Sequence, residues 1–156
     1  MKGNPKVVTL LNEVLVAELT AINQYFLGAS LCANRGYARL HDKLRHESIE
    51  EMKHAERLVE RIIYLEGLPN LQKLDKINVA DTPIGQLKAD VKLERASVER
   101  LNRGIETTRD AGDNGSAELL EDLLEAAEAH VDWLERQLDL VEQLGEAHYL
   151  AQQITK

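Results

Sequence analysis

Residues Leu44 to Leu65 read LRHESIEEMKHAERLVERIIYL. Leu44, Leu58 and Leu65 recur at the spacing of one helix face, so this stretch predicts an amphipathic α-helix. Glu51 and His54 stand three residues apart within that apolar stripe, which places their Cβ atoms about 5–6 Å apart on one face. An ExxH pair of this kind is common on helix surfaces, so its meaning depends on the rest of the chain.

The rest of the chain also predicts helices. Only Pro5, Pro69 and Pro83 interrupt it, and each falls where an apolar rhythm starts or stops. Short joints predict two antiparallel hairpins, whereas the sixteen residues from Gly67 to Thr82 are long enough to run the length of a bundle. This is the one-crossover topology of ferritin-like four-helix bundles. The predicted helices are 5–34, 37–66, 83–111 and 116–144, with a short fifth helix at 146–154.

Composition supports a single all-α domain over residues 1–156. Hydrophobic residues make up 44% and aromatic residues only 4%, so the core must be built from Leu, Ile, Val and Ala. The net charge of −8 argues against binding to nucleic acid or to an anionic membrane and suits a cationic partner. One cysteine, Cys32, cannot form an internal disulfide, and the first residues lack an apolar signal core, so we expect an inert thiol and a cytoplasmic protein.

Charged residues also interrupt the apolar stripes of the other three long helices. Glu18 and Glu94 each take a position where the rhythm calls for an apolar side chain, and His130 does so in the last long helix. A buried carboxylate costs several kcal/mol unless it is paired, protonated or bound to metal. With Glu51 and His54, these residues make the pattern of a dinuclear iron or manganese site in a four-helix bundle. For each residue alone, a buried salt bridge or a satisfied core histidine stays open.

The whole chain resembles a bacterioferritin, most specifically in AINQYF (Ala21 to Phe26), ESIEEMKHAERL (Glu47 to Leu58), LEGLPNLQ (Leu65 to Gln72) and HVDWLERQLDL (His130 to Leu140). The resemblance implies a hollow shell of 24 subunits that oxidises Fe(II), stores a ferric mineral and holds haem b between paired subunits. It also implies a ferredoxin as a partner in iron release. It assigns as ligands of a diiron ferroxidase centre Glu18, Glu51, His54, Glu94 and His130.

The same resemblance assigns three further roles. Met52 would be the haem iron ligand, donated by each of two paired subunits, although a methionine there otherwise suggests a core or interface residue. Tyr25 lies two turns after Glu18 and would donate electrons near the diiron centre; a packed tyrosine is the alternative. His46 and Glu50 form an i, i+4 pair that could bind iron on the inner wall of a shell, or could simply be solvated.

One position departs from the family pattern. The second ExxH of the family falls on residues 127–130, where this chain has Ala127, so a bridging carboxylate is missing. Glu128 and Glu125 cannot replace it, because their side chains point about 100° and 200° away around the helix. We therefore expect a weakened ferroxidase that co-assembles with a second, intact subunit type, although water or hydroxide could instead fill the gap.

Two other functions stay open on the sequence. One is a purely structural haem-carrying shell subunit without metal turnover, which is the extreme consequence of Ala127. The other is a small diiron oxidase or peroxidase of the rubrerythrin type, although the rubredoxin module of that class needs four cysteines and the chain has one.

Overall fold

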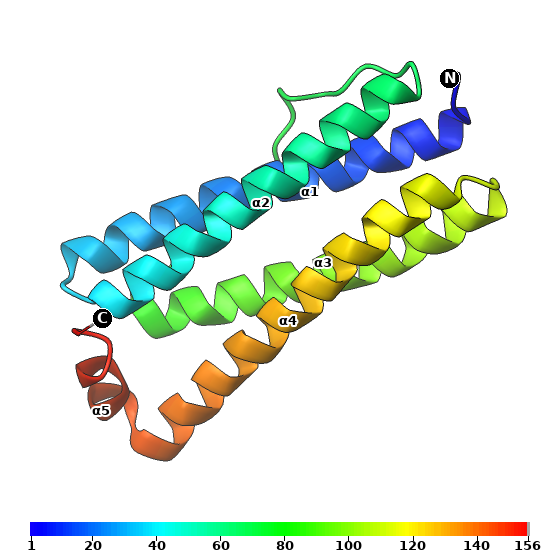
Figure 1. Ribbon diagram of the computed structural model, residues 1–156. Coiled ribbons are helices and arrows are strands. Elements are labelled where there is room, and N and C mark those ends of the chain that lie inside the picture. Colours follow the sequence, from blue (N-terminus) through cyan, green and yellow to red (C-terminus); the bar gives the residue numbers. More distant parts are fainter. Residues whose placement is uncertain (156) are drawn as a thin grey trace.

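The computed structural model describes residues 1–155 and shows an all-α bundle in that range, as predicted (Figure 1). Two long hairpins pack side by side, and a short helix closes one end. No helix in residues 1–155 is long and apolar enough to cross a membrane. The helices are α1 (Pro5–Asn34), α2 (Ala38–Tyr64), α3 (Pro83–Asp110), α4 (Asn114–Leu144) and α5 (Glu146–Ala151).

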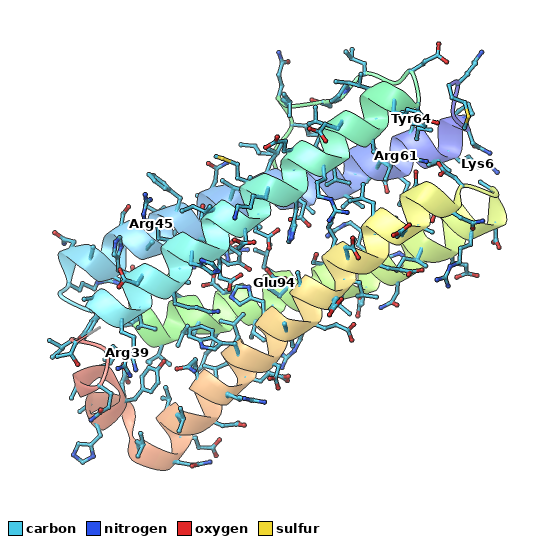
Figure 2. All side chains as sticks on the ribbon, in the orientation of Figure 1. Lys6, Arg39, Arg45, Arg61, Tyr64 and Glu94 are labelled. Atoms are coloured by element: carbon cyan, nitrogen blue, oxygen red, sulfur yellow. The ribbon has the colours of Figure 1, made fainter. Side chains whose placement is uncertain are left out.

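Tight turns join the helices of each hairpin. Gly36 lies between α1 and α2 with φ +88°, and Gly112 lies between α3 and α4 with φ +73°. A residue with a Cβ atom is strained at such positive φ values, so glycine lets the chain reverse within a few residues. Arg61 then ties the end of α2 to the start of α4, because it donates hydrogen bonds to Ser116 Oγ at 2.9 Å and to Asp113 Oδ1 at 2.6 Å (Figure 2).

The helix ends agree with the predicted ones to within three residues. Thr82 Oγ1 accepts a hydrogen bond from Gly85 N at 3.0 Å, so Thr82 and Pro83 begin α3 as expected. The predicted start of α4 at Ser116 was two residues late, because Asp113 is the N-cap and accepts from Ser116 N at 3.0 Å. The predicted end of the fifth helix at Ile154 was three residues late.

The crossover between α2 and α3 runs back along the first hairpin, which confirms the ferritin-like topology (Figure 1). Three α1 side chains, those of Asn12, Thr20 and Gln24, accept hydrogen bonds from its backbone. Their spacing of eight and four residues keeps them on one face of the helix. Because each bond satisfies a loop N–H with a side chain, the crossover needs no secondary structure of its own. The donors Asn70 N, Asp75 N and Asn78 N reach Asn12 Oδ1 at 2.8 Å, Thr20 Oγ1 at 2.9 Å and Gln24 Oε1 at 3.1 Å.

Helix α5 has only six residues and depends on packing for its stability. Its Tyr149 is 1% exposed and donates a hydrogen bond to Gln137 Oε1 of α4 at 2.7 Å. The backbone N–H of Arg39, near the start of α2, donates to Gln153 O at 2.9 Å. The C-terminal segment is therefore anchored to both hairpins.

The apolar core divides into two clusters along the bundle. Buried polar residues, including Glu18, Glu51, Glu94 and His130, lie on the same four helices. Leu15, Ala55 and Ala127 of the first cluster and Ala21, Val91 and Leu134 of the second flank these residues in sequence on their respective helices. The fold thus places a layer of ionisable groups between two apolar regions.

Candidate metal centre

One half of this polar layer is formed by α1 and α2. Glu18, Glu51 and His54 each offer a ligand atom within 4.8 Å of the others. His54 Nδ1 lies 3.3 Å from Glu51 Oε2 and 3.8 Å from Glu18 Oε2. Glu18 Oε2 is buried and accepts no hydrogen bond from residues 1–155. A buried carboxylate oxygen without a hydrogen bond is costly, which favours a bound cation at this position.

The other half is formed by α3, α4 and one more residue of α2. His130 Nδ1 lies 3.2 Å from Glu94 Oε1 and 3.6 Å from Glu47 Oε2. His130 is 3% exposed and Glu94 is 2% exposed, and Figure 2 shows Glu94 midway along the bundle, between the two hairpins. His130 Nε2 is buried and has no hydrogen-bond partner in the described part of the chain, so the polar contacts of this ring run through Nδ1.

Electrostatics joins the two halves into one centre. Burial raises the pKa of Glu51, and the nearby negative charge of Glu94 raises it further, although a hydrogen bond from His54 opposes both effects. Burial works against protonation of His130, but the hydrogen bond to Glu94 and the charges of Glu94 and Glu47 outweigh it and raise the pKa of the imidazole. The metal-free centre therefore retains protons that a divalent cation would replace.

Tyr25 lies against this centre, with its side chain fully buried. Its hydroxyl donates a hydrogen bond to Glu94 Oε1, and its ring meets that of His130 edge to face with centroids 5.1 Å apart. Burial, together with the charge of Glu94, raises the pKa of Tyr25 well above its ordinary value, so the phenol stays protonated. The structure thus places the predicted redox helper in contact with a predicted ligand, while its redox role stays a prediction.

Asp90 is a further buried acid, one turn before Glu94. Its Oδ1 accepts hydrogen bonds from Gln24 Nε2 at 2.8 Å and Gln86 Nε2 at 2.9 Å, and Oδ2 has no partner among residues 1–155. Burial raises the pKa of Asp90 to about 6 despite these two bonds. Because Gln24 and Gln86 also bond the crossover backbone, Asp90 helps to hold that segment in place.

Two cavities adjoin the centre. A small one of about 40 Å³ is lined by Glu18, Glu51 and Glu94 together with Asp75 of the crossover and Arg100 of α3. A second one, of about 200 Å³, lies between α2 and α4, and its lining residues include Glu47, Glu51, His54 and His130. Glu51 lines both cavities, so the centre can be approached along two different faces of the bundle.

Position 127 of α4 is an alanine that packs in the core. Ala127 is 6% exposed and belongs to the first apolar cluster. The side chains of Glu125 and Glu128, which lie on the same helix as Ala127, are both exposed. That the centre is incomplete at this position stays a prediction.

Sequence reasoning missed Glu47. Its side chain is 13% exposed and lies within 3.6 Å of His130 Nδ1. The signal was present, since Leu44, Glu47, Glu51, His54 and Leu58 follow one another at intervals of three and four residues and therefore share one helix face. Only the position of His130 on another helix shows what that face meets.

Of the other predicted site residues, Glu50 lines the cavity between α2 and α4, whereas His46 and Met52 line neither cavity beside the centre. His46 Nε2 is 4.0 Å from Glu50 Oε1, and both side chains are accessible, at 63% and 35%. Lys53 Nζ is closer to the same Glu50 oxygen, at 3.0 Å, so Glu50 is already paired. Met52 is 58% exposed on α2. An iron role for His46 and Glu50 and a haem role for Met52 stay predictions.

Comparison with known proteins identifies the class that this bundle represents. A family model described as a ferritin-like domain matches residues 8–144, which include all the predicted diiron ligands. Curated proteins named bacterioferritin align over nearly the whole chain. That of Streptomyces coelicolor is 48% identical over 97% of this chain and 90% of its own length, and that of Mycobacterium leprae is 45% identical over 100% and 98%. That of Brucella melitensis is 44% identical over 96% and 92%. The chain belongs to the ferritin-like family and, within it, to the bacterioferritins.

Proposed function

We propose that this chain is a subunit of a cytoplasmic shell that takes up Fe(II), oxidises it and stores it as a ferric mineral. The observation that carries the proposal is the buried layer in which two imidazoles each meet two carboxylates. The distances are 3.3 and 3.8 Å around His54 Nδ1 and 3.2 and 3.6 Å around His130 Nδ1. Membership of the bacterioferritins supports iron storage, and a shell of 24 copies is proposed from the same likeness.

The residues of the centre fit iron as a substrate. Carboxylate oxygen and imidazole nitrogen are suitable donors for Fe(II), and the single cysteine, Cys32, lies in the second apolar cluster rather than at the site. The layer is buried between apolar clusters, so the negative charges of Glu18, Glu51 and Glu94 act with little screening from water. A divalent cation would relieve their mutual repulsion.

The proposed reaction is the oxidation of two Fe(II) ions by dioxygen. Each iron gives up one electron, and dioxygen takes two electrons and two protons to leave as hydrogen peroxide. Glu18 and Glu94 would hold one ion each, and Glu51, which lines both cavities, would lie between the ions. Tyr25, hydrogen-bonded to Glu94, keeps that carboxylate oriented. The missing carboxylate at Ala127 predicts slower oxidation than in a complete centre.

We also propose haem b at Met52. Three large apolar side chains, Phe26, Ile49 and Met52, are 59%, 41% and 58% exposed, and a second copy of the chain would cover them. The hydrogen bond from Ser48 Oγ to Ile22 O, 2.9 Å long, sets the register between α1 and α2 on which these side chains lie. Two copies related by a twofold axis would offer one thioether each to the haem iron.

The haem assignment has a direct test. Met52→Leu keeps an apolar side chain and removes the sulfur, so we expect the visible spectrum of bound haem to be lost or converted to that of a weakly bound form. Ile63→Leu, at another exposed apolar position of α2, is the matched control and should keep the spectrum. An unchanged spectrum in Met52→Leu would overturn the assignment.

A second candidate function is a structural, haem-carrying subunit that co-assembles with an intact ferroxidase subunit. Ala127 is the observation that favours it, since the side chain packs in the apolar cluster and offers no ligand. Such a mixed shell would still need a ferredoxin or another electron donor for iron release. Metal counts on shells made from this chain alone separate the two functions.

The decisive experiment combines sedimentation with iron loading. Shells of this chain alone should sediment as a particle 24 times the mass of the 17.6 kDa subunit and should retain a ferric core after aerobic addition of Fe(II). A small dimer that turns over Fe(II) without retaining it would instead indicate a diiron oxidase or peroxidase. A shell that neither binds nor oxidises Fe(II) would refute the proposed function and leave the structural one.

A further inference from the structure

Glu47 occupies an unexpected place beside the metal centre. It lies on α2, one turn before Glu51, and its side chain is 13% exposed. Glu47 Oε2 is 3.6 Å from Nδ1 of His130, which belongs to α4. The family pattern expects a carboxylate at position 127 of α4 itself, and this chain has an alanine there.

The two halves of the centre have matching geometry. His54 Nδ1 is 3.3 Å from one carboxylate oxygen, of Glu51, and 3.8 Å from a second, of Glu18. His130 Nδ1 is 3.2 Å from Glu94 and 3.6 Å from Glu47. Glu47 therefore completes around His130 the arrangement of one imidazole and two carboxylates that already exists around His54.

These separations suit ligands of one ion. Metal–ligand bonds of about 2.0–2.2 Å at angles near 90–110° place neighbouring ligand atoms about 2.8–3.6 Å apart. The contacts of 3.2, 3.3 and 3.6 Å fall in that range, and the contact of 3.8 Å between His54 and Glu18 lies just outside it. A rotation about the outer bonds of a glutamate side chain covers that difference. Buried atoms without partners, Glu18 Oε2 and His130 Nε2, show that the layer is not satisfied by its own hydrogen bonds within residues 1–155.

Lys43 orients the Glu47 carboxylate. Lys43 Nζ lies 2.8 Å from Glu47 Oε1, the oxygen not directed at His130, and 4.9 Å from the centre of the Trp133 ring. The lysine is thus held by an aromatic face on α4 and by a carboxylate on its own helix. This arrangement leaves Oε2 available to a metal, as in carboxylate ligands whose second oxygen accepts a hydrogen bond.

We propose that Glu47 is a metal ligand that supplies, from α2, the carboxylate that Ala127 does not supply from α4. The inference rests on the proposed metal-binding function and deepens it. With Glu47, the centre has four carboxylates for the four positive charges of two divalent ions. The His130 half can then hold an ion although the second ExxH motif is incomplete.

The test is a titration with Co(II) by equilibrium dialysis, in which the cobalt content of the shell counts the bound ions without any turnover. The wild-type shell should bind two Co(II) per subunit. Glu47→Gln should keep the ion of the His54 half and bind the second at least tenfold more weakly. The double variant Glu47→Gln with Ala127→Glu should regain the second ion, because the carboxylate returns from α4. Glu128→Gln, which removes an exposed carboxylate of α4, is the matched control and should behave as wild type.

Each other outcome counts against the proposal. Two ions bound to Glu47→Gln with wild-type affinity would overturn it, as would the loss of both ions or a wild-type stoichiometry of one. Circular dichroism and sedimentation on the same samples show whether the variant folds and assembles, and the double variant separates a lost ligand from a damaged fold. If the wild type bound no Co(II) at all, the proposed metal-binding function would fail as well. If the wild type bound two Co(II) ions and Glu47→Gln did the same with equal affinity, only the role of Glu47 would fail.

Discussion

Replacing Glu51 with glutamine should stabilise the metal-free protein and remove its response to metal. Glu51 is 7% exposed, and its Oε2 lies 3.3 Å from His54 Nδ1. Glutamine has nearly the same volume and keeps an oxygen that can accept from His54, so the substitution removes mainly the negative charge. The metal-free centre holds that charge at a cost, because burial and Glu94 raise the pKa of Glu51.

The size of the effect follows from the burial of the carboxylate. Relief of an incompletely compensated buried charge contributes on the order of 1–2 kcal/mol. For a chain of this size that corresponds to a rise of roughly 2–8 °C in melting temperature. The size of this gain depends on pH. Because the folded-state pKa of Glu51 is raised, the penalty of its charge is absent below the unfolded-state pKa and complete above the folded-state pKa. The gain from glutamine should therefore grow as pH rises from 4 to 7.5.

Bound metal should reverse the order of stability of the wild type and Glu51→Gln. A divalent ion at about one hundred times its dissociation constant stabilises the folded state by about 2.7 kcal/mol. The wild-type melting temperature should then rise by roughly 5–11 °C with Co(II). Glu51→Gln lacks the charge that we propose to lie between the two ions, so its melting temperature should change by less than a third of that amount.

Differential scanning calorimetry of chelator-treated and Co(II)-loaded shells measures both effects, with sedimentation to verify equal assembly. Glu60→Gln, at an exposed position of the same helix, is the control and should shift stability by less than about 0.5 kcal/mol. A Glu51→Gln protein that melts lower than wild type without metal and gains as much from Co(II) would refute the reasoning.

Two further predictions concern the groups around the centre. Asp90→Asn mimics the protonated acid. Because the pKa of Asp90 is raised to about 6, the wild type should lose up to about 3 kcal/mol of folding stability relative to the variant as pH rises from 4 to 7. Calorimetry on metal-free shells measures this difference, and a difference independent of pH would contradict the prediction. Tyr25→Phe removes the hydroxyl donor to Glu94 without changing the ring, so the metal-free protein should lose about 1.5–3 kcal/mol and melt roughly 3–12 °C lower; an unchanged melting temperature would show that the bond contributes nothing.

Much of the fold could be predicted from local sequence. The range of α1 was predicted to the residue, and Thr82 with Pro83 marked the start of α3, because a cap and a proline act on the first turn of the helix that they precede. The start of α4 was misplaced because Asp113, Asn114, Gly115 and Ser116 are all acceptable at a helix N-terminus. Only the bonds from Ser116 and Arg61 to Asp113 select it as the cap.

The candidate centre, too, could be predicted from the sequence only in part. Glu51 and His54 share a face at a spacing of three residues, and their proximity follows from helix geometry alone. Glu18 and Glu94 were recognised as carboxylates in apolar stripes, which predicts burial but not a partner. Glu47 fitted the same stripe as Glu51 and was overlooked, since a glutamate at the edge of a stripe can equally face solvent.

The sequence by itself determined that the chain forms four long helices with a crossover and that each helix carries ionisable groups on its buried face. These properties depend on periods of three to four residues and on turn chemistry, which are local. Only the tertiary structure decided which groups meet: His130 of α4 with Glu94 of α3 and Glu47 of α2, and Tyr25 of α1 with Glu94. Such contacts depend on the rotation and offset of packed helices, and a shift of one residue turns a side chain by about 100°, away from the centre.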